Sequence, residues 1–407
     1  GVGDYLSENI TNLNGAVNDA RLIETYLKDE AVQAAFAQVH LKTLHDQAAT
    51  KKALVEGFKA HLSQAKPGDT ALFYFAGHGV REKTDVALFT QDEIDGHIAG
   101  IVCHDSDSYV SDADKTTLSD KEMRYLIGKI VGEGNAKPHV VTLFDCCHSG
   151  SNTRSAAGEE LPPRSRQVSR TPFGARSWEG FVFHQDQKVK DAIKENLSLN
   201  DALPLADHVM IAACREVELA WEAPGKDGQP TNGAFTSALV DVLKQNNGRI
   251  SYHELHSRVL NRMRFVKVVE KDGADDVRQT PQVFVQGLRP ADRYNLFLTN
   301  QANEQPSYGS VAYNDEENEW RFDLGALHGV PIGGNTPVKV YPAANEADVT
   351  EVTIKHVFPT HSVLKAPDNL KDKGALRGEV IGMGIPSLKI YLTGEEVGVN
   401  LAKQVID

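Results

Sequence analysis

Residues 140–150, VVTLFDCCHSG, combine an apolar run with an abrupt end at an acid, two cysteines and a histidine. The run is β-branched, aliphatic or aromatic without sustained polar alternation, which predicts a strand buried on both faces of a sheet. Ligands bind at the carboxyl edge of an open parallel sheet. The polar residues from Asp145 onward are therefore expected to carry the chemistry.

Residues 70–80, TALFYFAGHGV, have the same form, because an apolar run ends at His78 between two glycines. If the two predicted strands are neighbours, the imidazole lies within reach of a thiol far away in the sequence. A thiolate is a nucleophile, and an imidazole helps to form it and then protonates the leaving group. The N–H groups of Gly79 and Cys147 could stabilise an oxyanion, since glycine lets a carbonyl approach the backbone.

Each of these residues also has a structural interpretation. A buried cysteine is usually an inert small hydrophobe, and a histidine between glycines is usually part of a turn. Two such residues, each at the end of a buried strand, favour catalysis. A metal site at Cys146, Cys147 and His148 is not expected, because adjacent ligands cannot readily span a tetrahedral site and the chain has no CxxC or HxxxH partner. His148 is predicted to be structural.

The motifs FAGHG and DCCHSG together resemble the caspase-like cysteine peptidases of clan CD, and among them the metacaspases and bacterial caspase-like proteins. The animal caspase signature around the cysteine is different. The resemblance covers about residues 1–284 and implies a caspase-like α/β/α sandwich with a mostly parallel central sheet. It further implies that Cys147 is the nucleophile, that His78 is its partner and that Cys146 is filler.

The same resemblance implies an acidic S1 pocket built by Asp145 and Asp19. Residues 15–20, GAVNDA, match the family motif G-C-x-N-D-A, in which the aspartate lines the pocket and Ala16 here replaces the cysteine. The alternative for Asp19 is simple capping of a helix that begins near Asn18. A buried pair of carboxylates is costly unless a cation meets it, so a basic P1 residue is expected, with Arg favoured over Lys for its bidentate geometry.

Further along the chain, local signals predict the elements around these motifs. Residues 208–213, HVMIAA, predict another buried strand, and the resemblance places Trp221 and Glu222 in a subsite wall beyond it. Helix starts are predicted from residues that favour the N-cap position and from capping boxes. These signals are Thr50, Ser119 with Glu122, Asn232, and Ser251 with Glu254.

Composition limits the class of protein. The 407 residues are 41% apolar, which predicts a globular chain of two or three domains. A net charge of −13 argues against general affinity for nucleic acid or anionic membranes and suits basic peptides. Four cysteines, two of them adjacent, predict a reducing compartment, and we expect a cytoplasmic protein. No apolar run is long enough for a transmembrane helix, and no signal peptide is visible in the sequence, which starts at Gly1 without Met and leaves a removed leader open. The strand that normally precedes Gly1 in the family is absent, so a trimmed chain is expected.

Residues 1–290 are predicted to form the peptidase domain, interrupted by an exposed, arginine-rich linker at residues 151–180. The linker stands in the place of the family's intersubunit linker, which suggests self-cleavage after arginine. Residues 306–407 contain short alternating runs, including residues 388–392, and predict a small β-sandwich or barrel. We interpret this part as a regulatory or interaction module, with a plain structural extension as the alternative.

No cofactor is expected. Some metacaspases bind calcium through aspartates after the histidine and the cysteine, but Arg154 stands at the matching position after the cysteine and no EF-hand loop is present. The resemblance leaves calcium dependence open. The predicted function is a cysteine endopeptidase that cleaves protein substrates after basic residues, in a bacterial cell-death or defence pathway. The alternative is a latent or non-catalytic scaffold that binds a partner.

Overall fold

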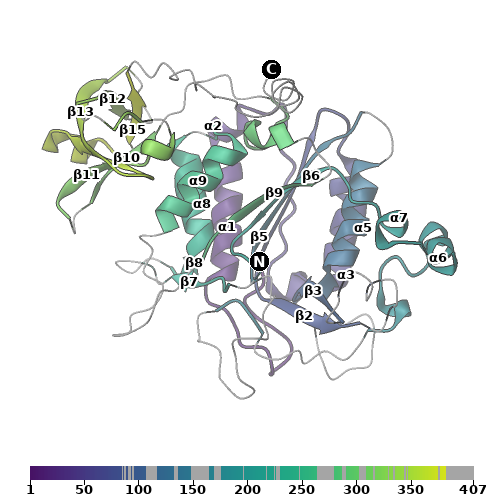
Figure 1. Ribbon diagram of the computed structural model, residues 1–407. Coiled ribbons are helices and arrows are strands. Elements are labelled where there is room, and N and C mark those ends of the chain that lie inside the picture. The colour runs from purple at the N-terminus through teal and green to yellow at the C-terminus, as the bar shows by residue number, and fades with distance from the viewer. Residues whose placement is uncertain are drawn as a thin grey trace, which may run out of the picture. The chain divides into compact units, whose positions relative to one another are not determined.

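In the computed structural model the chain divides into two compact units, Gly1–Gln305 and Pro306–Asp407 (Figure 1). The structure describes residues 1–84, 96–106, 117–132, 136–147, 165–168, 176–263, 279–301 and 309–381, with short gaps inside the last three ranges, and the single residues 86, 89 and 93.

A four-stranded sheet forms the centre of the first unit, with the strand order β1-β5-β6-β9. Strands β1, β5 and β6 are parallel, and β9 is antiparallel to β6. Every residue of β5 is buried, as its apolar sequence predicts. The strands are β1 (Thr70–Ala76), β5 (His139–Asp145), β6 (His208–Ala212) and β9 (Gln282–Gln286).

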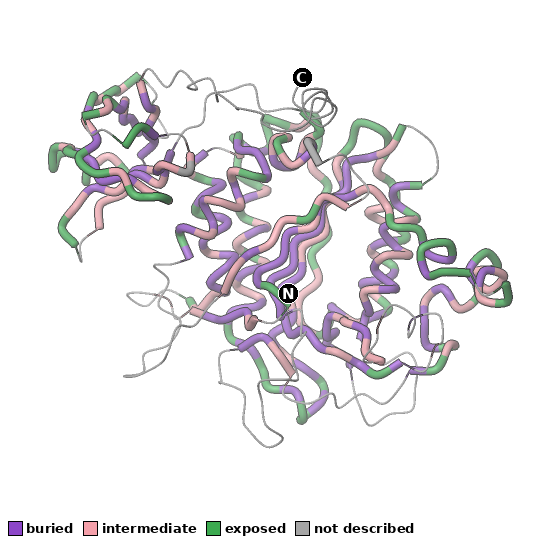
Figure 2. Tube along the Cα trace, in the orientation of Figure 1, coloured by how far each residue is buried: buried purple, intermediate pink, exposed green. Residues whose placement is uncertain are grey.

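Helices cover both faces of this sheet, with α1, α8 and α9 on one side and α3 and α5 on the other (Figure 1). Alternate residues of β5 enter two different cores: Val141 and Leu143 pack with the first group of helices, and Val140 and Phe144 pack with the second. Figure 2 shows the central strands as largely buried between the layers. The helices of this unit are α1 (Ala16–Leu27), α2 (Glu30–Gln33), α3 (Lys51–Ala60), α5 (Asp120–Val131), α6 (Gln187–Lys194), α7 (Leu199–Ala202), α8 (Ala234–Gln245) and α9 (Tyr252–Met263).

Two predicted helix caps are confirmed. The Thr50 side chain accepts a hydrogen bond from the Ala53 N–H at the start of α3, and Ser119 forms a complete capping box with Glu122 at the start of α5. At α9, the Glu254 N–H donates to Ser251 Oγ. Such bonds depend only on neighbouring residues, which is why the sequence predicts them.

Two other predicted starts are wrong. Helix α1 begins at Ala16 with Gly15 as its cap, so Asn18 and Asp19 lie within the first turn and Asp19 does not cap the helix. Helix α8 begins at Ala234 after Gly233, so Asn232 is not its cap. In both places the asparagine side chain bonds to a distant segment instead: Asn18 donates to the Thr231 carbonyl, and Asn232 donates to Asp19.

Two small sheets lie beside the central one in the first unit. One has the order β2-β3-β4 and begins directly after His78, and the other pairs β7 with β8. The strands are β2 (Gly79–Lys83), β3 (His97–Ile101), β4 (Leu118–Ser119), β7 (Glu222–Ala223) and β8 (Asn232–Gly233).

The second unit is a closed β-barrel with the order β10-β11-β14-β13-β12-β15. The predicted α/β fold followed by an all-β part is therefore confirmed, with a barrel rather than a sandwich. The predicted strand at residues 388–392 lies outside the described residues. The strands are β10 (Gly309–Asn314), β11 (Glu319–Phe322), β12 (Pro337–Pro342), β13 (Thr350–Val357), β14 (Ser362–Lys365) and β15 (Leu376–Val380).

All four cysteines are buried and free of disulfide bonds. Within the described part of the chain, no helix is long and apolar enough to cross a membrane.

Candidate active site

The parallel pairing of β1 and β5 brings the two motifs to one edge of the sheet. Ala76 pairs with Asp145, so the residues that follow them leave the sheet side by side. The two adjacent cysteines then separate: Cys146 packs into the core next to α3 and α5, whereas Cys147 packs into the core next to α1 and α8. The side chains of the pair therefore have different surroundings.

Cys147 lies at the centre of a group of backbone hydrogen bonds. Its Sγ accepts one from the Ala220 N–H at 3.1 Å. The N–H groups of Cys147 and Gly79 both donate to the carbonyl oxygen of Arg166, at 3.3 and 3.0 Å. Gly79 has no room for a side chain, because a Cβ would lie 1.7 Å from the Cys147 carbonyl oxygen. Two N–H groups that converge on one carbonyl oxygen form the arrangement that stabilises an oxyanion.

His78 is buried, and hydrogen bonds hold both its ring and its main chain. Nε2 lies 2.7 Å from the Thr11 carbonyl oxygen, and the His78 main-chain N–H donates to the Tyr5 hydroxyl at 2.8 Å. Burial lowers the pKa of His78 to about 4, and the hydrogen bond to the Thr11 carbonyl oxygen opposes that shift. The imidazole is therefore neutral at pH 7. Since a carbonyl only accepts, Nε2 carries the proton and Nδ1 is unprotonated; Nδ1 has no hydrogen-bond partner within the described residues.

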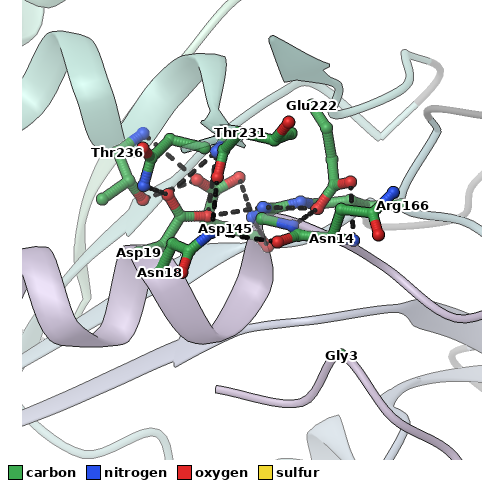
Figure 3. Close-up of polar contacts among 12 residues, drawn as sticks. Gly3, Asn14, Asn18, Asp19, Asp145, Arg166, Glu222, Thr231 and Thr236 are labelled. Carbon is green, nitrogen blue, oxygen red and sulfur yellow. Dashed lines mark hydrogen bonds and ion pairs between the residues drawn. The ribbon is translucent and has the colours of Figure 1, made fainter. Parts of the chain in front are cut away.

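A fully buried ion cluster lies beside Cys147, with the Arg166 guanidinium among three carboxylates (Figure 3). Its Nη1 lies 3.0 Å from Asp145 Oδ1, and its Nη2 lies 3.2 Å from Glu222 Oε1 and also donates to Asp19 Oδ2. Three acids therefore face one cation. A buried charge needs this kind of compensation, because desolvation costs several kcal/mol per ion.

Donors from other segments hold each carboxylate in place. Asp19 accepts from the Gly233 N–H and the Asn232 side-chain amide, each at 2.9 Å, which is why Asn232 is not free to cap α8. Asp145 accepts from the Thr236 N–H at 3.1 Å and its hydroxyl at 2.5 Å. Burial raises the pKa of Asp19 to about 7, and the Arg166 guanidinium opposes that shift.

Glu222 is fixed from the opposite side of the guanidinium. It accepts from the N–H groups of Asn14 and Gly15, at 3.0 and 2.7 Å. Gly233 leaves space for the cluster, because a Cβ there would lie 2.3 Å from Asp145 Oδ2 and 2.8 Å from Arg166 Nη1. The three carboxylates thus enclose the planar guanidinium of Arg166.

The sequence of the unit that contains this site matches a known protein family. The family model of the caspase domain, peptidase family C14, matches residues 1–291. The chain belongs to this family. The resemblance inferred from the two motifs is therefore confirmed.

Curated relatives of this caspase domain include three metacaspases. The chain is 22% identical to metacaspase-2 of Arabidopsis thaliana, over 74% of this chain and 66% of the relative. It is 25% identical to metacaspase-1 of Yarrowia lipolytica, over 62% and 55%, and 27% identical to metacaspase-3 of Trypanosoma brucei brucei, over 54% of each. The matches thus span about half to two thirds of these relatives. The crystal structure of protein GSU0716 from Geobacter sulfurreducens is 23% identical with a TM-score of 0.44, over 71% of this chain and 89% of that one.

The predicted site residues of this caspase domain fall into three groups. The N–H groups of Cys147 and Gly79 meet at the Arg166 carbonyl oxygen, with His78 next to Gly79 in the chain, and Asp19 and Asp145 both pair with the Arg166 guanidinium. Glu222, predicted as a subsite wall, is a third acid that pairs with this guanidinium. Trp221 instead pairs through its backbone with Ser165.

Sequence reasoning missed the occupant of the pocket and the groups that hold it. Arg166 is one of five arginines in the predicted linker, and no local signal separates it from the others. The roles of Thr236, Gly233 and Ala220 depend on contacts between distant segments. His148, Arg154 and most of the linker lie outside the described residues. Among the residues that are described, no group of three or more His, Cys, Asp or Glu could hold a metal ion.

Proposed function

We propose that this chain is a cysteine endopeptidase that cleaves protein substrates after basic residues, Arg in preference to Lys. One observation carries the proposal: a single residue, Arg166, has its guanidinium among three buried carboxylates while its carbonyl oxygen accepts from the N–H groups of Gly79 and Cys147. The three carboxylates thus hold the basic side chain while the N–H groups of Gly79 and Cys147 hold the carbonyl of the same residue. An arginyl substrate would use the same contacts.

In the proposed mechanism Cys147 is the nucleophile and His78 moves the proton. The unprotonated Nδ1 of His78 takes up the thiol proton as Cys147 Sγ attacks the carbonyl carbon, and the N–H groups of Gly79 and Cys147 hold the oxyanion. His78 then protonates the departing amine. Water hydrolyses the thioester and restores the thiol. The Ala220 N–H, which donates to Sγ, favours the charged form of sulfur.

Fluorogenic peptides ending in Arg, Lys or Asp, assayed with and without calcium, test the proposal. We expect hydrolysis after Arg, slower hydrolysis after Lys and none after Asp, because the pocket presents three carboxylates to the P1 side chain. Cleavage after Asp at a rate comparable to Arg would contradict the pocket assignment. No hydrolysis by the wild-type chain in any condition would favour the latent or scaffold alternative.

The pH dependence of kcat/KM for arginyl peptides is expected to reflect Asp19. Burial raises the pKa of Asp19 to about 7 although the Arg166 guanidinium opposes that shift, so this carboxyl group takes up a proton near neutral pH. A carboxyl group is charged above its pKa. The affinity for arginine is therefore present above that pKa and is lost as the pH falls through it. We expect Asp19→Asn to remove this acid limb from the profile; a wild-type profile that is flat across neutrality would contradict the assignment.

The wider setting is part of the proposal. A role in bacterial cell death or defence follows only from the resemblance of the motifs. The closed barrel of the second unit is proposed as a regulatory or interaction module for a protein partner.

A further inference from the structure

Tyr5 is a buried residue near the start of the chain that contacts His78 twice. Its hydroxyl accepts a hydrogen bond from the His78 main-chain N–H at 2.8 Å. Its ring packs against the imidazole, with 5.2 Å between the ring centroids. Because one side chain contacts both the main chain and the ring of His78, it restrains where the imidazole lies and how it is turned.

The Tyr5 hydroxyl is itself held in place. It donates to the Val2 carbonyl at 2.9 Å, and the Val2 N–H donates to the Ala76 carbonyl, two residues before His78, at 2.9 Å. Burial raises the pKa of Tyr5, so the hydroxyl stays protonated and can donate and accept at the same time. A chain of hydrogen bonds therefore leads from the end of β1 through Val2 and Tyr5 back to His78.

Tyr5 is also bonded to the part of the chain that orients the imidazole. Its main-chain N–H donates to Asn12 Oδ1 at 3.1 Å, and Asn12 Nδ2 donates to Asp4 Oδ1 at 3.1 Å. Asn12 directly follows Thr11, whose carbonyl oxygen lies 2.7 Å from His78 Nε2. The bond between Tyr5 and Asn12 thus fixes the Thr11 carbonyl relative to the tyrosine that holds the His78 main chain.

We propose that Tyr5 is a positioning residue for the proposed reaction, and that it holds the His78 imidazole where Nδ1 can take the proton of Cys147. Tyr5 acts through His78 rather than on the substrate. This inference rests on the proposed peptidase function. It adds to that function a residue that lies in neither sequence motif.

Loss of the Tyr5 hydroxyl is expected to slow the chemical step more than it weakens binding. Without this acceptor the buried His78 N–H has lost its partner, so the main chain must shift to satisfy it. A small displacement of a group that transfers a proton lowers the rate, because the transfer requires hydrogen-bond distance between heavy atoms. The three carboxylates that would bind the P1 side chain come from other parts of the chain and should bind it as before.

Tyr252 supplies a matched control at the other end of the central sheet. Its hydroxyl accepts from the Leu298 main-chain N–H at 2.9 Å and lies 2.7 Å from His139 Nε2, and its ring lies 5.9 Å from the His139 ring. His139 begins β5, whereas Asp145 ends this strand beside the candidate active site. Tyr252→Phe therefore removes a buried hydroxyl with the same kinds of partner, away from the site.

The experiment compares Tyr5→Phe with Tyr252→Phe in the full chain. Both changes keep the aromatic ring and remove one hydroxyl, so both should lower the temperature of thermal unfolding. Steady-state kinetics on a fluorogenic arginyl peptide give kcat and KM. The rate at which iodoacetamide alkylates Cys147, followed by mass spectrometry of the peptide that contains it, reports on activation of the thiol without any turnover.

We expect Tyr5→Phe to lower kcat about tenfold and to leave KM within about twofold of the wild type. Alkylation of Cys147 should slow by a similar factor. Tyr252→Phe should keep both rates, although it loses stability. A Tyr5→Phe chain with the wild-type kcat, or one that loses no more activity than Tyr252→Phe, would overturn this inference and leave the peptidase function standing.

The alkylation rate separates a failure of this inference from a failure of the peptidase function. If the wild type hydrolyses no arginyl peptide, the peptidase function is overturned. Alkylation then decides the role of Tyr5: a slower rate in Tyr5→Phe than in Tyr252→Phe supports the positioning of His78, and equal rates refute it.

Asn12→Ala tests the same inference if Tyr5→Phe does not fold. The Asn12 side chain is exposed, so its removal should leave the fold intact while it frees the Tyr5 N–H. We expect kcat to fall about threefold with KM unchanged, because the Thr11 carbonyl then loses part of its support. A wild-type kcat in a folded Asn12→Ala chain would count against the inference.

Discussion

Replacing Cys147 by alanine is expected to lower kcat/KM for arginyl peptides by at least about a thousandfold, because removal of a nucleophile leaves only the contribution of binding and the oxyanion site. The variant should still fold. Cys147 is only 1% exposed, but cysteine and alanine differ by a single sulfur atom, so the change removes little volume from the core. Steady-state kinetics give the loss of activity, and thermal unfolding checks the fold.

Cys146→Ala is the matched control for this prediction. It changes the same residue type at the adjacent position, but its side chain packs with α3 and α5 on the other face of the sheet. We expect activity close to wild type. If Cys146→Ala abolished hydrolysis and Cys147→Ala retained it, the assignment of the nucleophile would be wrong.

Replacing Asp19 by asparagine is expected to lower kcat/KM for arginyl peptides by about a hundredfold, since truncating one partner of a buried, hydrogen-bonded charge pair costs about 2–5 kcal/mol. Asparagine has nearly the same shape, so the loss comes from charge. The new amide would also present donors to the Gly233 N–H and the Asn232 amide, which now donate to Asp19. The measurement is best made in the Arg166→Ala background, where the chain's own arginine does not compete.

Asp191→Asn supplies the comparison for Asp19→Asn, because Asp191 is a half-exposed carboxylate on α6. That change should leave the kinetics unaltered. The effect at Asp19 should appear mainly in KM and should be larger for arginyl than for uncharged P1 residues. An equal loss for all P1 residues would indicate a general disturbance of the site rather than a cation pocket.

Local sequence was enough to predict much of the fold. The apolar runs around Val141 and Phe73 predict buried strands because they show no sustained polar alternation, and both form the central sheet. The caps at Thr50 and Ser119 follow from neighbours in the chain. The wrong starts near Asn18 and Asn232 have one cause: both side chains bond to partners across the site, Asn18 to the Thr231 carbonyl and Asn232 to Asp19.

By itself, the sequence determined the family, the sheet and the residues that carry reactive groups, because short motifs at strand ends encode them. Only the tertiary structure decided which groups meet. It selected Arg166 from five linker arginines, since burial among acids from three distant segments compensates its charge. It also brought Glu222 into contact with the Arg166 guanidinium. Gly233 packs against this cluster because it has no side chain that would collide with Asp145 and Arg166. Contacts of this kind depend on long-range packing, which no local pattern records.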